Sequence, residues 1–203
     1  MNKKQKKIIA GNSSDVITSS ISVPERLLCE YLENPLGIGT AVPRLSWELK
    51  PLRRGACQSA WRVVAASTRD AVISGSCDLW DSGRTESAQS IHIEYAGKPL
   101  TGGQTVWWRV MVWDAEGIAT VWSAPASFET GLLDESDWHG EWIAAPENIS
   151  SPLMRREFTL GDKKVKRARI YVSGLGYSEI YVNGKRSGDR VLDPAWTDYD
   201  RRE

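Results

Sequence analysis

The feature that most constrains the fold is a strict alternation of side-chain types in residues 105–114 (TVWWRVMVWD). Successive side chains of an extended strand point to opposite faces, so a period of two predicts a strand with one buried face. One face would carry Val106, Trp108, Val110 and Val112, and the other Trp107, Arg109, Met111 and Trp113. On the second face, Arg109 can lie between indoles as a stacked cation.

The same alternation recurs through the first two thirds of the chain, in short runs separated by turn residues. These runs are residues 27–32, 43–49, 58–67, 79–83, 91–94 and 122–130. Residues 70–75 fit one short helical turn or a loop, and no long helical pattern occurs. Strands spaced by roughly 8–12 residues, with turns between them, predict an all-β fold: an immunoglobulin-like or fibronectin-III-like β-sandwich over residues 25–131.

A second all-β unit is predicted over residues 147–203, after a connector at residues 132–146. Its first clear strand is residues 168–173, where every second residue is apolar and would face a core. Asn183-Gly184 follows a further alternating run and suits a two-residue type I′ hairpin turn, because both positions tolerate positive φ. The unit is therefore expected to consist of short strands joined by tight turns.

Charge and metal-binding residues limit the functions that this chain can have. Its 26 basic and 26 acidic residues give a formal net charge of +0. Nucleic-acid and membrane-surface binding both need a basic surplus, so neither partner is expected. The three cysteines are widely spaced and odd in number, and two histidines occur. Neither a disulfide framework nor a zinc or iron site is expected.

The N-terminal residues 1–24 are polar, basic and serine-rich, which predicts a disordered tail. After the basic start, three apolar residues precede Gly11. That run is shorter than the apolar region of a signal peptide, and no run is long enough for a transmembrane helix. We therefore expect a cytoplasmic location.

Motifs spread over most of the chain make the prediction more specific. They include residues 34–38 (NPLGI), 43–47 (PRLSW), 58–63 (QSAWRV), 79–83 (LWDSG), 107–110 (WWRV), 128–133 (FETGLL), 155–158 (RREF), 168–172 (ARIYV) and 196–199 (WTDY). Taken in this order, the motifs resemble the N-terminal region of bacterial α-L-rhamnosidases of the large inverting glycoside hydrolase family. The resemblance covers roughly residues 27–203.

The resemblance implies a fibronectin-III-like sandwich followed by the start of a jelly-roll domain. In the family, hydrolysis takes place in a separate helical barrel later in the chain, by an inverting reaction that uses two carboxyl groups. Nothing here matches that barrel, so we expect this chain alone to be inactive. A jelly roll has eight strands, so we expect a fragment whose truncated second module packs on missing C-terminal domains. The parent enzyme would act on rhamnose-containing carbohydrate.

Candidate carbohydrate-binding residues lie in the second unit: Asn183, Trp196, Asp198 and Tyr199. Carboxylates accept hydrogen bonds from sugar hydroxyls, while an aromatic ring stacks on the apolar face of the sugar. Carboxylate oxygens could also hold calcium, and the resemblance includes jelly-roll modules credited with binding rhamnose through calcium. No other cofactor is expected. In the alternative interpretation, Trp196 fills the sandwich and the aspartates are turn residues.

Three functions remain open from the sequence. The favoured one is the non-catalytic N-terminal portion of an α-L-rhamnosidase, which acts as a scaffold and as a carbohydrate-recognition surface. The second is a stand-alone carbohydrate-binding module. The third is a fibronectin-like domain that binds other proteins.

Overall fold

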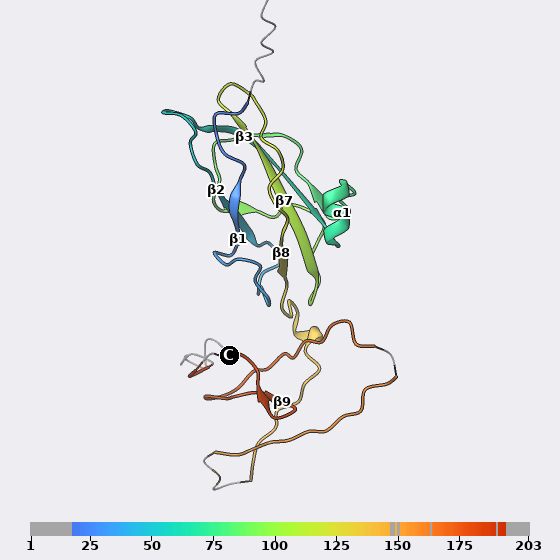
Figure 1. Cartoon of the computed structure of the whole chain (residues 1–203). Coiled ribbons are helices and arrows are strands. Elements are labelled where there is room, and N and C mark those ends of the chain that lie inside the picture. The colour runs from blue at the N-terminus through green and yellow to red at the C-terminus, as the bar shows by residue number, and fades with distance from the viewer. Residues whose placement is uncertain (1–17, 147–148, 150, 163, 190, 194–203) are drawn as a thin grey trace, which may run out of the picture. The chain divides into compact units, whose positions relative to one another are not determined.

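The structure is a computed structural model (Figure 1), and it describes residues 18–146, 149, 151–162, 164–189 and 191–193. The chain divides into two compact units, Met1–Trp142 and Ile143–Glu203. Each unit is described by itself below. The first contains a folded core between two sheets, and the described part of the second contains a β-hairpin among segments without regular secondary structure.

The first unit is a sandwich of two antiparallel β-sheets (Figure 1). The first sheet contains, in spatial order, β1 (Glu25–Cys29), β2 (Arg44–Glu48) and β6 (Ile93–Glu94). The second contains, in spatial order, β4 (Trp80–Asp81), β3 (Gln58–Ala66), β7 (Thr105–Asp114) and β8 (Ala126–Glu129), and β5 (Thr85–Glu86) also pairs with β3. The predicted all-β class is confirmed.

The longest ladder joins β3 and β7, which pair in antiparallel register from Ala60↔Trp113 to Ala66↔Trp107. Along β7, buried residues alternate with half-buried residues over the whole strand. The strand expected at residues 105–114 and its two faces are therefore confirmed. The buried side chains are those of Val106, Trp108, Val110 and Val112, each at most 1% exposed.

Aromatic side chains from both sheets meet in the core. The rings of Trp47 on β2 and Trp61 on β3 lie 6.0 Å apart, edge to face, and so join the two sheets. Phe128 of β8 contacts Tyr95 in the same way, with ring centroids 6.4 Å apart. Each such pair contributes about 0.5–1.5 kcal/mol beyond the apolar area that it buries. These tryptophans are core residues rather than exposed platforms.

The segment between β1 and β2 closes one side of the sandwich. The Ile38 N–H donates to the Glu129 carbonyl (2.9 Å), and the Gly131 N–H donates to the Ile38 carbonyl (2.8 Å). The Asn34 side chain accepts a hydrogen bond from the Ser127 N–H (2.8 Å). This segment runs along the outer edge of β8, where an open edge would invite pairing with another chain.

A short helix, α1 (Arg69–Ser74), lies against the outward side of the second sheet (Figure 1). The Thr68 side chain caps its first turn, and Gly75 ends it with φ 87°, a conformation that costs glycine little. Val72 of the helix packs with Val64 of β3 in a small second core. Of the two conformations left open for residues 70–75, the structure has the helical turn.

The predicted disordered tail of residues 1–24 must be corrected at its C-terminal part. Residues 1–17 lie outside the described residues. Ile21, however, is 3% exposed within the main core, and the Leu52 N–H donates to the Ser20 carbonyl (2.9 Å). A single isoleucine between serines gives no alternation, so the sequence pattern did not reveal this segment.

The second unit contains the predicted hairpin. Its strands β9 (Tyr181–Val182) and β10 (Lys185–Arg186) pair in antiparallel register. Between them, Asn183 has φ 50° and Gly184 has φ 75°. A type I′ turn requires positive φ at both positions, so the Asn-Gly prediction is confirmed.

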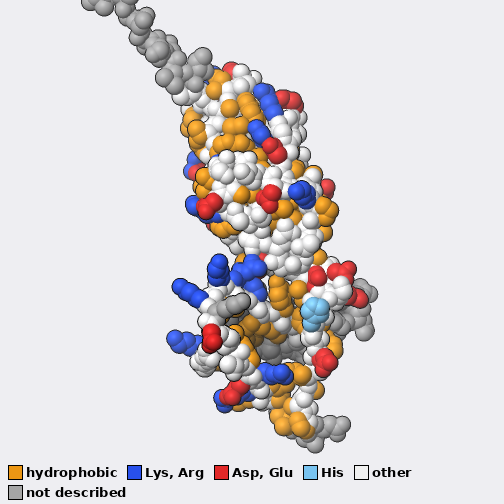
Figure 2. All heavy atoms as spheres, turned by 90° about the vertical axis from the view of Figure 1, so that its right-hand side faces the viewer, with side chains coloured by type: hydrophobic (Ala, Val, Ile, Leu, Met, Phe, Trp, Pro, Cys, Tyr) orange, Lys and Arg blue, Asp and Glu red, His pale blue; other side chains and the backbone are white. Residues whose placement is uncertain are grey.

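The strand predicted at residues 168–173 is wrong for this structure, because no strand is assigned there. Ile170 and Val172 are 59% and 51% exposed. An apolar strand face is stable when it packs on a second layer, and the described part of this unit supplies no such layer. Hydrophobic side chains consequently show on the surface of this unit, in the lower part of Figure 2.

The Gln58 amide links the two sheets and provides a first prediction. Its Oε1 accepts from the Trp47 indole N–H (3.0 Å), and its Nε2 donates to the carbonyls of Ser87 (3.0 Å) and Gln89 (2.8 Å). Gln58→Leu should lower the free energy of unfolding by about 1–3 kcal/mol, because it leaves a buried indole N–H without an acceptor. Urea unfolding followed by fluorescence measures this loss.

A second substitution provides the control. In the Gln58→Leu background, Trp47→Phe should lower the free energy of unfolding by less than it does in the wild type. The reason is that it removes the indole N–H that has lost its acceptor. Equal stability of Gln58→Leu and the wild-type chain would contradict the prediction.

Candidate functional site

The structure places the predicted binding residues only in part. Trp196, Asp198 and Tyr199 lie outside the described residues, so the predicted cluster stays a prediction. Asn183 lies in the turn between β9 and β10, and the positive φ of that turn accounts for an asparagine there. Its position alone does not identify a binding site.

Polar side chains lie close to that turn. The Glu179 carboxylate accepts from the Tyr181 hydroxyl (2.9 Å) and pairs with the Arg186 guanidinium (2.9 Å). The hydrogen bond to Glu179 raises the pKa of the Tyr181 phenol. A carboxylate, a phenol and a guanidinium can all hydrogen-bond to sugar hydroxyls, but here they are exposed and bonded to one another.

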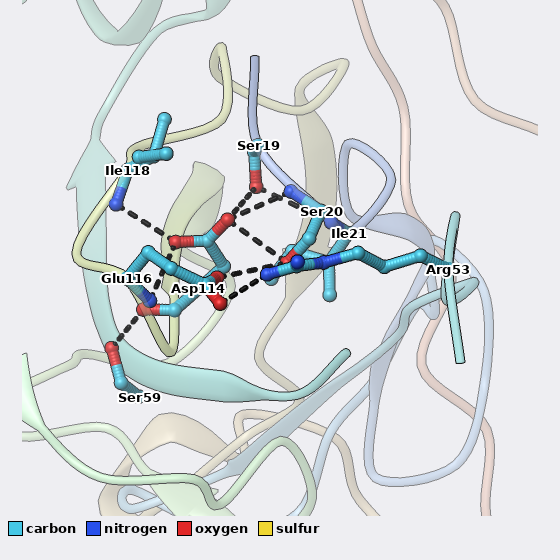
Figure 3. A network of polar contacts seen from close by, with 8 residues as sticks. All are labelled: Ser19, Ser20, Ile21, Arg53, Ser59, Asp114, Glu116 and Ile118. Atoms are coloured by element: carbon cyan, nitrogen blue, oxygen red, sulfur yellow. Dashed lines mark hydrogen bonds and ion pairs between the residues drawn. The ribbon is translucent and has the colours of Figure 1, made fainter. Parts of the chain in front are cut away.

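A buried polar network centres on Asp114, the last residue of β7 (Figure 3). Its Oδ1 accepts from the backbone N–H groups of Glu116 (3.1 Å) and Ile118 (2.8 Å), which form the turn after β7. Its Oδ2 accepts from the Ser20 N–H (2.7 Å), the Ser20 hydroxyl (3.0 Å) and the Ser19 hydroxyl (3.3 Å). One carboxylate therefore holds both the turn and the N-terminal segment.

Neighbouring side chains extend this network. The Glu116 carboxylate pairs with Arg53, and the Ser59 hydroxyl donates to the Asp114 carbonyl. Burial acts to raise the pKa of Asp114, but hydrogen bonds from Ser20 and from the turn outweigh it and lower the pKa to about 2. The carboxyl group is therefore ionised at neutral pH and acts as a structural anchor.

The outward face of the β3–β7 sheet carries stacked arginine and tryptophan side chains. Arg62 of β3 donates two hydrogen bonds to Asp81, at 2.8 and 2.5 Å. The Arg109 guanidinium carbon of β7 lies 4.6 Å from the centre of the Trp122 ring, and that of Arg62 lies 5.9 Å from the same ring. Arg109 was predicted to lie between indoles; the structure confirms stacking on one indole, that of Trp122, which lies outside β7.

A second stacked pair lies on this face. The Arg84 guanidinium carbon is 4.9 Å from the centre of the Trp113 ring, and Arg84 also pairs with Glu86 (2.7 Å). Arg109 differs, because its Nε–H is buried without an acceptor in the described part of the chain. Burial lowers the pKa of Arg109. The sequence predicted the stacking but gave no sign of this unmet donor.

A pocket of about 280 Å³ lies beside β1. Arg26 lines it and pairs with Glu33 (3.5 Å), another lining residue, and with Glu48 (2.6 Å). Glu25 also lines the pocket and pairs with Lys50, so each charged side chain of the lining is in an ion pair within the first unit.

An exposed cluster lies near the start of β2. The Tyr31 hydroxyl is hydrogen-bonded to His92 Nε2 (2.6 Å), and the Arg44 guanidinium lies 5.3 Å from the centre of the Tyr31 ring. Arg44 also pairs with Glu30 (2.6 Å). These side chains satisfy one another, so the cluster stabilises the loop after β1.

The residues that the structure describes also bear on metal binding and on membrane insertion. Within them, no three His, Cys, Asp or Glu side chains are grouped so that they could hold a metal ion. Within the same residues, no helix is long and apolar enough to cross a membrane.

Comparison with known proteins identifies the family. A family model described as "Rha78A-like, N-terminal immunoglobulin domain" matches residues 24–134, which is more than half of the chain. A second, "Alpha-L-rhamnosidase N-terminal domain", matches residues 163–203. The chain belongs to the α-L-rhamnosidase family. The resemblance inferred from the sequence motifs is therefore confirmed.

Individual α-L-rhamnosidases agree with these matches. The chain is 36% identical over 187 residues to an α-L-rhamnosidase of Formosa agariphila, which covers 86% of this chain and 20% of the relative. The solved α-L-rhamnosidase structure from Dictyoglumus thermophilum superposes with a TM-score of 0.82 at 35% identity, over 90% of this chain and 22% of that one. The solved structure of Streptomyces avermitilis α-L-rhamnosidase complexed with L-rhamnose superposes with a TM-score of 0.59 at 41% identity. That match covers 62% of this chain and 12% of the other.

These α-L-rhamnosidases are much longer than the region that they share with this chain. The chain spans about a fifth of the length of the first curated relatives that it matches. The matched immunoglobulin-like range begins at residue 24, so the Ser19 and Ser20 contacts to Asp114 lie outside it. The N-terminal segment is thus a part of the sandwich that the family match does not include.

The depressed pKa of Asp114 predicts a specific pH dependence of stability. The pKa of Asp114 is about 2 in the folded state and about 3.9 in the unfolded state. The ionised carboxylate therefore stabilises the fold at pH values above the unfolded-state pKa, and this stability is lost as the pH falls through the folded-state pKa. Asp114→Asn should be less stable than the wild type by about 2 kcal/mol at neutral pH. The difference should disappear toward pH ~2. Urea unfolding at a series of pH values measures it.

The control for this measurement is Asp162→Asn, which changes an exposed aspartate of the second unit. That variant should keep the wild-type pH dependence. A difference between Asp114→Asn and the wild-type chain that stayed constant down to the lowest pH would refute the anchoring role of the carboxylate.

Proposed function

We propose that this chain is the non-catalytic N-terminal portion of an α-L-rhamnosidase. The observation that carries the proposal is the succession of two N-terminal family matches along a chain about a fifth as long as its curated relatives. In this proposal, the remaining polypeptide hydrolyses terminal α-L-rhamnosyl residues of glycosides or polysaccharides. The present chain provides a scaffold and a carbohydrate-recognition surface.

The described carboxyl groups support a non-catalytic role. An inverting glycosidase needs one carboxylic acid that stays protonated to donate to the leaving oxygen, and therefore has a raised pKa. The carboxyl groups with a resolved pKa shift are all shifted downward: Glu30, Asp78, Asp81, Asp114 and Asp134. Each accepts hydrogen bonds that favour its ionised form, so each is suited to holding structure rather than to donating a proton.

The scaffold role is supported by the second unit. Leu153, Phe158 and Leu175 of this unit are 103%, 78% and 62% exposed, and the hydrophobic side chains reach its surface (Figure 2). Large apolar side chains exposed in such number favour contact with a further surface. In this proposal, further polypeptide of the same enzyme covers them.

The proposal predicts how activity is divided along the polypeptide. The purified 203-residue chain should release no nitrophenol from an aryl α-L-rhamnoside. The same polypeptide extended through the reading frame downstream of codon 203 should release it. Absorbance of the released nitrophenolate measures both. Activity in the shorter chain, or none in a folded extended chain, would disprove the proposal.

Carbohydrate recognition is tested separately by calorimetric titration with L-rhamnose. Binding should be weakened by Trp196→Ala, because that variant loses the proposed stacking surface. If carboxylates such as Asp198 hold calcium beside the sugar, a chelator should remove the binding and calcium should restore it. Unchanged affinity in Trp196→Ala would exclude this residue as the sugar contact.

A further inference from the structure

One guanidinium on the outward face of the β3–β7 sheet is not balanced by a carboxylate within the described part of the chain. On this face, Arg62 is held by Asp81 and Arg84 is held by Glu86. The Arg109 side chain has no hydrogen bond or ion pair to any described residue, and its Nε–H is buried without an acceptor. Among these three arginines, Arg109 is therefore the one whose charge no carboxylate of the described residues balances.

The surroundings of Arg109 strengthen any interaction with an anion. The ring of Trp122 stacks against its guanidinium, 4.6 Å from the centre of the ring. Trp107 comes two residues earlier on the same face of β7 and is half-buried. Both indoles pack against the small core under α1. An ion pair formed in such apolar surroundings is stronger than one formed in water.

We propose that Arg109, Trp107 and Trp122 form a binding site for an acidic sugar, in which a hexuronate carboxylate pairs with the guanidinium. The apolar face of the sugar ring would lie on an indole, as sugar rings do on aromatic side chains. A hexuronic acid carries one carboxylate on each ring and so matches one free cation. An acidic peptide would need several cations, and Arg62 and Arg84 are already paired.

The choice of a saccharide as the ligand rests on the proposed function, whereas the choice of an anion rests on the geometry of Arg109. The two can fail separately, because rhamnoside hydrolysis is measured on the extended polypeptide and uronate binding on the 203-residue chain. A negative result for rhamnoside hydrolysis would not affect the result for uronate binding, and the reverse also holds.

The test titrates the whole 203-residue chain with D-glucuronate, and with glucose and acetate as probes that carry only the ring or only the carboxylate. We expect glucuronate to bind at least about tenfold more tightly than either probe, since only it uses both contacts. Calorimetry gives the affinities. The Arg109 Nε–H signal in ¹H–¹⁵N NMR, assigned by its absence in Arg109→Lys, should shift with glucuronate.

Variants on the same face make the result specific. Arg109→Gln should abolish the preference for glucuronate over glucose, and it should fold because it removes a desolvated charge. Arg84→Gln is the matched control, since Arg84 also stacks on an indole but is paired with Glu86. The Arg84→Gln variant should keep the preference for glucuronate over glucose. Circular dichroism checks the folding of both variants.

Three outcomes would overturn the proposal. The first is no binding of glucuronate by the wild-type chain at millimolar concentration. The second is acetate binding as tight as glucuronate binding, which would mean a site for any carboxylate. The third is an equal loss in Arg84→Gln and Arg109→Gln, which would mean a general charge effect.

Discussion

The pairing of β3 with β7 is the interaction on which the rest of the first unit depends. The ladder runs from Ala60↔Trp113 to Ala66↔Trp107. The remaining strands of this sheet pair with its two strands, β4 and β5 with β3, and β8 with β7. Its inward side chains form one wall of the main core, against β2 and its Trp47. Its outward side chains support α1 and the stacked arginines. Because strand side chains alternate, this one ladder fixes both faces of the sheet at once.

Asp114 extends that ladder to the N-terminal segment. The carboxylate lies where β7 ends, and its five hydrogen-bond donors come from the following turn and from Ser19 and Ser20. A buried charge is tolerated when hydrogen bonds satisfy it, and these donors supply that compensation. Ile21 can therefore enter the core. The segment is held by the Asp114 carboxylate and by backbone hydrogen bonds to residues 50–52 rather than by a regular strand, which explains why it has no sequence pattern.

Local patterns predicted the elements whose pairing partners lie within the same unit of the described chain. The alternation in residues 105–114 and the Asn183-Gly184 turn each follow from backbone geometry, and both are confirmed. The strand expected at residues 168–173 has the same alternation, yet the structure does not form it. Alternation reports which face of a strand would be buried, but not whether a second layer exists to bury it. The unmet donor of Arg109 was unpredictable for a similar reason, since it depends on which side chains from other segments, such as Trp122, lie beside it.

The two units therefore differ in what they need from other parts of a protein. The first buries aromatic side chains between two sheets, covers the edge of β8 and satisfies the carboxylate at Asp114, so its main core is formed by residues of this unit. In the second, apolar side chains such as those of Phe158 and Ile170 stay exposed, although their spacing is typical of a buried face. A sequence that encodes an apolar face is consistent with a partner surface that covers it. The first unit can thus act through its surface chemistry, whereas the second is expected to act through contact with further polypeptide.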